Sequence, residues 1–114
     1  MAGDLDTTFD GDGKVTTDFG NTGDVAHSVA IQSDGKIVVA GFSRFEGNFN
    51  SEDFALARYN SNGSLDTTFD GDGKITTDFD GEYDNALSVA IQSDGKILVA
   101  GVSNRYDFAL ARYN

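Results

Sequence analysis

The chain alternates short apolar runs with turns rich in Gly, Asn and Asp, and the apolar runs come in two sets of four. The first set is GKVTTDF at 13–19, AHSVAIQ at 26–32, KIVVAGFS at 36–43 and DFALARYN at 53–60. Runs of this length and composition are typical of β-strands. The turn SDGK at 33–36 joins two of them through Asp-Gly, which predicts a hairpin. Because no segment shows a helical stripe, we predict an all-β fold.

The second set of runs repeats the first. An offset of sixty residues maps 5–43 onto 65–103, and DFALARYN returns at 107–114 after the register slips by six. The extra residues of the first copy lie within 44–52, and insertions of this kind collect in surface loops. A repeat of this length indicates one supersecondary unit per copy. We predict a first repeat over 1–60 and a second over 61–114.

The polarity of the runs predicts their order in a sheet. KIVVAGF is apolar on both faces, as in a strand buried on both sides, whereas KVTTDF is the most polar of the set. A four-stranded antiparallel sheet that runs from buried inner strands to a polar outer strand is a β-propeller blade. We therefore predict two four-stranded blades per chain, with small Ala and Ser residues allowing neighbouring blades to approach closely.

Three motifs recur in order and at matching spacing: GSLDTTFDGDGKITTDF, AxSVAIQSDGKILVAG and DFALARYN. Together they closely resemble the delta-60 repeat, a bacterial β-propeller repeat that occurs in tandem, and the resemblance covers essentially the whole chain. It implies a propeller fold and a secreted or cell-surface setting, with no known activity and no catalytic residues. The chain departs from the family in carrying two copies, whereas family members carry enough for a closed ring.

A blade needs a neighbour on each of its two apolar faces, and a pair of blades shares only one contact. If each remaining face holds several hundred Å² of apolar surface, its exposure costs on the order of 10 kcal/mol. That cost rivals the whole stability of a small domain, roughly 5–15 kcal/mol. We therefore expect further copies of the chain to cover both faces.

The phase of the repeat predicts how copies join. Counted from the inside outward, a blade reads SVAIQ, KIVVAGF, DFALARYN and then the next GKITTDF, so the run at 13–19 lacks inner partners and 107–114 lacks an outer one. We predict that these runs pair between chains by strand addition. The closure residues are Lys14, Val15, Thr17, Phe19, Phe108, Leu110, Arg112 and Tyr113.

Such a contact is heterologous, so it can close into a ring of identical subunits. Three chains give six blades and four give eight, both within the usual range of about 4–8. We expect a homotrimer, with a homotetramer as the next choice.

The formal net charge is −11, which makes nucleic acid a poor partner. Cysteine is absent, which excludes disulfides and thiolate metal sites. No apolar run approaches the ~20 residues of a membrane span, and MAGDLDTT has neither the charge nor the apolar core of a signal peptide. A Met placed directly ahead of a repeat fits an excised or designed segment and a short natural reading frame equally.

The acidic loops are the weak candidates for a metal. DTTFDGDGK begins like a calcium loop, with oxygen ligands at alternate positions and Gly at the sixth. The match ends at Lys14 and Thr17, in the ninth and twelfth positions, so the alternative is a tight turn that needs Gly and Asp for backbone geometry. Apart from this Ca²⁺ we expect no cofactor. The candidate ligands are Asp6, Asp10, Asp12, Asp66, Asp70 and Asp72.

Catalytic motifs are missing from the sequence. His27 is the only histidine and Leu87 replaces it in the second copy, and there is no nucleophile elbow or phosphate-cradling loop. We expect a structural or binding module that is not an enzyme. Polar ligands have a candidate site in the central channel, near 28–32 and 88–92. The alternative is a calcium- or carbohydrate-binding module, the latter through loop aromatics Phe45, Phe49 and Tyr106.

Overall fold

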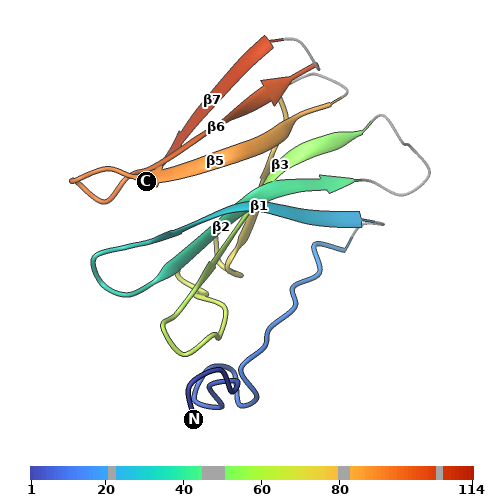
Figure 1. The fold of residues 1–114 in the computed structure, drawn as a ribbon. Helices are drawn as coiled ribbons and strands as arrows, with labels where there is room; N and C mark the ends of the chain where they lie inside the picture. Colours follow the sequence, from blue (N-terminus) through green and yellow to red (C-terminus); the bar gives the residue numbers. More distant parts are fainter. Residues whose placement is uncertain (21–22, 45–50, 80–82, 105–106) are drawn as a thin grey trace.

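The computed structural model describes residues 1–20, 23–44, 51–79, 83–104 and 107–114. These residues form seven β-strands in two antiparallel sheets, with no helix among them (Figure 1). The all-β prediction is confirmed. A search of the described residues for a helix long and apolar enough to cross a membrane finds none.

The first sheet has the strand order β1-β2-β3-β4, and we call it blade 1. Its strands are β1 Gly23–Ile31, β2 Ile37–Arg44, β3 Glu52–Tyr59 and β4 Lys74–Thr77. The outermost strand, β4, comes from the GKITTDF run of the second repeat, which pairs with the DFALARYN run of the first. The predicted order of runs within a blade is therefore confirmed.

The second sheet, blade 2, has the order β5-β6-β7 and three strands. They are β5 Asn85–Ile91, β6 Ile97–Ser103 and β7 Asp107–Tyr113. A second four-stranded sheet is thus not formed by the described residues. The run at 13–19, predicted as a strand, is not one here, because an extended segment becomes a strand only when a neighbour pairs with its backbone.

Local sequence explains the inner strands. Each Ser-Asp-Gly-Lys turn closes with the same backbone bond, from Gln32 N–H to Lys36 C=O and from Gln92 N–H to Lys96 C=O, both 2.8 Å. Between Ala26 and Ser28 the register of β1 against β2 shifts by a bulge. Gly41 lies opposite, where a Cβ atom would come within 1.8 Å of the Val25 carbonyl oxygen. Only glycine fits there.

Each blade has two faces, because side chains alternate along a strand. We call them the Phe face and the Val face. In blade 1 the Phe face carries Val38, Ala40, Phe54 and Leu56, and in blade 2 it carries Leu98, Ala100, Phe108 and Leu110. The Val face carries Val29, Ile37, Val39 and Ala55 in blade 1, and Val89, Ile97, Val99 and Ala109 in blade 2.

The core lies between the two blades. The Phe face of blade 1 packs there against the Val face of blade 2, with Phe69 at its edge. Every named residue of these two faces is buried, and Phe54, Leu56, Ile97 and Val99 are fully enclosed. The hydrophobic core is therefore an interface between two copies of one repeat.

Candidate functional site: two uncovered blade faces

The blade 1–blade 2 contact shows how one repeat fits the next. Phe54 and Leu56 project from β3 into the core, and the ring of Phe54 meets that of Phe79 edge-on at 4.7 Å between centroids. Ile75 of β4 packs against the same cluster. A Phe face is thus covered jointly by the Val face of the next blade and by its own outer strand.

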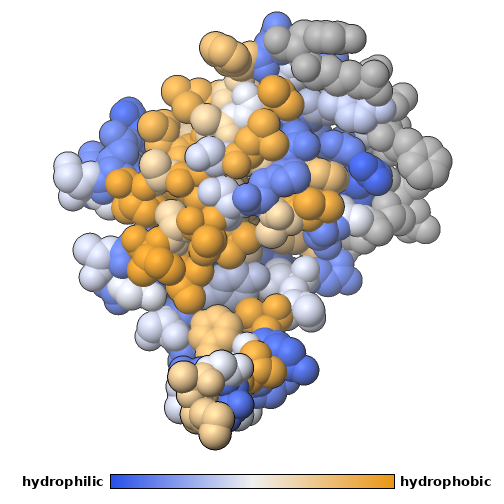
Figure 2. Space-filling model, viewed as in Figure 1, coloured by the Kyte–Doolittle hydropathy of each residue, from blue (hydrophilic) through white to orange (hydrophobic). Residues whose placement is uncertain are grey.

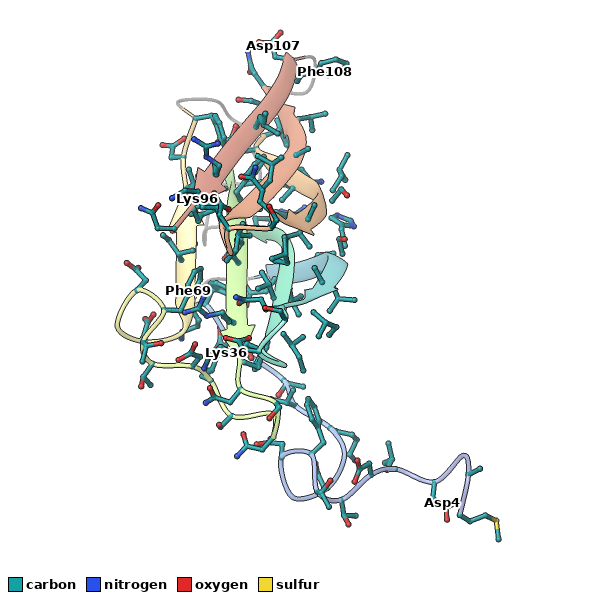
Figure 3. All side chains as sticks on the ribbon, turned by 90° about the vertical axis from the view of Figure 1, so that its left-hand side faces the viewer. Asp4, Lys36, Phe69, Lys96, Asp107 and Phe108 are labelled. Carbon is teal, nitrogen blue, oxygen red and sulfur yellow. The ribbon has the colours of Figure 1, made fainter. Side chains whose placement is uncertain are left out.

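In blade 2 the same Phe face is bare. Phe108 is the counterpart of Phe54 in an identical octapeptide, yet it is 102% exposed where Phe54 is 0% exposed. Leu110 is 62% exposed, whereas its counterpart Leu56 is fully buried. Figure 3 shows Phe108 at the tip of β7, at the end of the molecule opposite Asp4. Blade 2 therefore exposes an apolar face that no described part of the chain covers.

The Val face of blade 1 is partly uncovered, at the exposed side chains of its inner strand β1. Val29 is 61% exposed, against 9% for its counterpart Val89 in the core. Figure 2 shows apolar side chains in a broad patch that extends over both blades. Large uncovered apolar patches commonly mark interaction sites.

A cavity of about 280 Å³ opens on this Val face. It lies between the face and residues 14–19, which we call the N-terminal segment. Its lining includes Val15, Phe19, Val39, Ala55, Ala57 and Tyr59. Their counterparts Ile75, Phe79, Val99, Ala109, Ala111 and Tyr113 all belong to the core that receives Phe54 and Leu56. The cavity therefore has the lining of a socket for a Phe and a Leu.

The N-terminal segment sits on blade 1 as β4 sits on blade 2. The hydroxyls of Thr17 and Tyr59 share a hydrogen bond of 2.5 Å, and those of Thr77 and Tyr113 share one of 2.6 Å. The segment therefore occupies the place of an outer strand for a blade that precedes blade 1. Of the predicted closure residues, Lys14, Val15, Thr17 and Phe19 belong to the N-terminal segment. Phe108, Leu110, Arg112 and Tyr113 belong to β7, where Tyr113 already packs against the core within the single chain.

The acidic loops fold as tight turns. Asp6 Oδ1 accepts hydrogen bonds from the N–H and hydroxyl of Thr8, at 3.0 and 2.6 Å, and Asp66 repeats both bonds with Thr68. The two Asp-Gly-Asp-Gly stretches adopt positive φ, including 51° at both Asp10 and Asp70. The hydroxyl and N–H hydrogen bonds from Thr8 lower the pKa of Asp6.

Asp66 has partners that Asp6 lacks. Arg58 Nε donates to Asp66 Oδ2 at 2.9 Å, and Lys36 Nζ lies 3.2 Å from the same oxygen. The guanidinium of Arg58 also stacks over the Phe69 ring at 4.6 Å. The Thr68 bonds, with Lys36 and Arg58, lower the pKa of Asp66, although burial opposes them. The counterparts of this cluster lie at opposite ends of the chain: Asp6 and Phe9 at one, Lys96 and Arg112 at the other.

A different acidic group does converge. Asp53, Asp78 and Asp84 place their carboxylate oxygens within 4.8 Å of one another, and this is the single metal-sized group found among the described residues. Burial raises the pKa of Asp53 to about 6, and the charges of Asp78 and Asp84 add to that effect. The six predicted loop carboxylates do not form such a group. Sequence reasoning missed this trio because its members belong to separate runs.

The inner strands leave one further hollow. It measures about 320 Å³ and is lined by the Ile-Gln-Ser triplets at 31–33 and 91–93, together with Gly95. This is near the predicted channel. Gln92 Oε1 is buried there without a hydrogen-bond partner in the described residues. Phe45, Phe49 and Tyr106, the predicted carbohydrate-gripping aromatics, lie outside the described residues.

The family model described as a β-propeller domain of unknown function (DUF5122) matches residues 32–69 and 92–114, more than half of the chain. The chain belongs to this β-propeller family. The two matched segments start at Gln32 and Gln92, equivalent positions of the two repeats. No curated protein and no solved structure matched the chain. Membership in the DUF5122 family agrees with the blade-like sheets and supports a structural or binding module.

Proposed function

We propose that this chain is a non-catalytic module, of the delta-60 repeat type, that assembles head-to-tail with copies of itself into a closed propeller ring. In that ring the Phe face of blade 2 packs into the cavity on blade 1 of the next copy. The N-terminal segment of that next copy then pairs with β7 as its missing outer strand. The observation that carries the proposal is the contrast between Phe54 and Phe108, one residue of the repeat that is enclosed in one copy and bare in the other.

The contact between blades 1 and 2 serves as the template. There, β3 pairs with β4 in the register Ala55↔Thr76 and Leu56↔Ile75. Carried over by the repeat, this register pairs Ala109 with Thr16 and Leu110 with Val15 of the next copy. The Thr–Tyr hydroxyl bond occurs at the equivalent place in both repeats, and it holds the N-terminal segment in position to accept β7.

Charge supports the same arrangement. Lys96 Nζ donates a hydrogen bond to Asn114 Oδ1 at 2.8 Å, as Lys36 Nζ does to Asn60 Oδ1 at 2.9 Å. Lys96 is therefore held in blade 2 in the same way as Lys36 is in blade 1. Asp6 is exposed, and among the described residues its carboxylate accepts hydrogen bonds only from Thr8 in its own turn. In the ring, Asp6 would join Arg112 and Lys96 of the preceding copy, as Asp66 joins Arg58 and Lys36 within one chain.

The first test is the mass of the assembly, measured by size-exclusion chromatography with light scattering. A homotrimer of six blades would have three times the 12.1 kDa of one chain, and the homotetramer of eight blades four times. We favour the trimer. The same faces would also serve further repeats of a longer chain, and the 114-residue chain tests the contact in trans directly. A monomer at micromolar concentration would refute the proposal.

The register can be tested by disulfide trapping, because the chain has no cysteine of its own. Directly paired residues of antiparallel strands lie about 4.5–5.5 Å apart, within disulfide reach. The double variant Ala109→Cys, Thr16→Cys should give covalent rings of defined size on non-reducing gels. Ala55→Cys, Thr76→Cys is the matched control, which should crosslink within one chain. Pairing Ala109→Cys with Thr17→Cys, one position out of register, should trap far less.

A further inference from the structure

Three aspartates from separate parts of the chain meet at the edge of the blade 1–blade 2 contact. Asp53 lies at the start of β3, Asp78 directly follows β4, and Asp84 directly precedes β5. The β3–β4 register, continued by one residue from Phe54↔Thr77, places Asp78 opposite Asp53. Like charges directly opposite each other destabilise a sheet.

Two hydrogen bonds hold the Asp84 carboxylate in place, whereas no described residue donates a hydrogen bond to the Asp53 carboxylate. Asp84 Oδ1 accepts from the Ser103 hydroxyl at 2.7 Å, and Oδ2 accepts from the Phe79 N–H at 2.9 Å. Asp53 is only 8% exposed, yet its carboxylate has no hydrogen bond and no ion pair in the described part of the chain. The nearby Arg44 guanidinium is engaged by Glu52 at 2.6 Å. A carboxylate on a buried residue beside two other carboxylates is stabilised when a bound cation neutralises part of their charge.

We propose that Asp53, Asp78 and Asp84 bind a hard divalent cation of the Ca²⁺ type. The donor set consists of carboxylate oxygens, without the His or Cys that softer metals prefer. The oxygens all lie within 4.8 Å of one another, a span that two Ca–O bonds of about 2.4 Å cover. Asp78 is exposed, so water reaches the site to complete the coordination. The bonds from Ser103 and Phe79 orient Asp84 as outer-shell donors orient metal ligands.

The first repeat contains two of the three members of an equivalent site. Asp24 is the counterpart of Asp84 and is held in the same way, by the Ser43 hydroxyl at 2.7 Å and the Phe19 N–H at 3.1 Å. Asp18 precedes Phe19 as Asp78 precedes Phe79. The third member, Asp107, starts β7 at the opposite end of the chain (Figure 3). If copies join as proposed above, Asp107 meets Asp18 and Asp24 of the next copy, and a second cation bridges the two chains.

The experiment is calorimetric titration of Ca²⁺ into protein stripped with chelator, beside light scattering of the same samples. The assembled wild-type chain should bind two ions per chain. Asp53→Asn and Asp107→Asn should each lose one of them, and the double variant should lose both. Asp70→Asn is the matched control in an acidic loop, and it should keep both ions.

Thermal unfolding separates loss of binding from loss of folding. In chelator, Asp53→Asn should melt at or above the wild-type temperature, because it removes a buried charge that has no partner. Ca²⁺ at about 1 mM should raise the melting temperature of the wild type and leave that of Asp53→Asn, Asp107→Asn unchanged.

The intrachain site and the ring fail in different ways. A monomer that binds one ion per chain, lost in Asp53→Asn and kept in Asp107→Asn, would support the intrachain site and refute both the ring and the bridging site. A ring that binds no Ca²⁺, or binds it equally in both single variants and the double variant, would overturn the cation proposal and leave the ring intact.

Discussion

Replacing Phe108 with alanine distinguishes a monomeric chain from one that assembles into a ring. In the single chain the Phe108 side chain is fully exposed and supports no packing. Removing it there should change the free energy of unfolding by no more than about 0.5 kcal/mol. The same substitution at Phe54, which is enclosed in the core, should cost about 3–5 kcal/mol. Phe54→Ala therefore measures, within one chain, the free energy that a Phe gains by packing between two blades.

In the ring Phe108 would fill the cavity on the neighbouring Val face, so its loss should weaken each contact between chains by a similar amount. At about 1.4 kcal/mol per factor of ten, 3–5 kcal/mol raises the dissociation constant of one contact roughly 10²- to 10⁴-fold. The assay is light scattering or sedimentation over a wide range of protein concentration, with denaturant unfolding of both variants in parallel. Phe108→Ala should shift the midpoint of assembly to much higher concentration.

Two results would refute this reasoning. If Phe108→Ala and the wild type have the same mass at every concentration, Phe108 takes no part in assembly. If Phe108→Ala unfolds as readily as Phe54→Ala at concentrations where the wild type is monomeric, the bare face must be covered within the single chain.

Three further predictions test the charges and the backbone. Asp6→Asn should weaken assembly by about tenfold in low salt and leave the unfolding of the monomer unchanged, because its partners Arg112 and Lys96 are supplied in trans; light scattering at two salt concentrations checks both. The lowered pKa of Asp66 stabilises the fold fully above its unfolded pKa of about 3.9, and that stabilisation is lost progressively as the pH falls below this value. Asp66→Asn should therefore make the denaturant midpoint depend less on pH between pH 4 and pH 2. A midpoint that falls as steeply with pH in the variant as in the wild type would argue against this. Gly41→Ala should destabilise by about 3 kcal/mol or more in denaturant unfolding, because its Cβ would overlap the Val25 carbonyl oxygen, and a neutral result would show that the bulge yields.

The strand order was readable from the sequence because the repeat supplies its own alignment. The polar run GKITTDF follows DFALARYN in the chain, and the structure pairs them as β4 and β3. The same repeat alignment predicted a strand at 13–19, which the single chain does not form. The composition of 13–19 favours an extended conformation, but a β-ladder also needs a partner strand, and only the fold determines whether one is present.

Burial is the feature that local sequence could not supply. DFALARYN occurs twice with the same eight letters, and the two copies have opposite exposure at Phe54 and Phe108. The aspartate trio was invisible for a related reason. Asp53 and Asp78 are 25 positions apart, and only the register of β3 against β4 brings them together. The regular spacing of the acidic loops drew attention to carboxylates that mainly cap their own turns.

The geometry of the repeat also bears on why a closed ring should dominate over open chains. The contact within one chain is covalently tethered, whereas the same contact between chains must overcome the loss of translational and rotational freedom. An open trimer makes two such contacts and bears that loss for each. The third contact joins ends already held close together, so it forms at high effective concentration and adds its full packing energy. Open dimers and trimers should therefore be sparsely populated, and the assembly should pass from monomer to ring with little between.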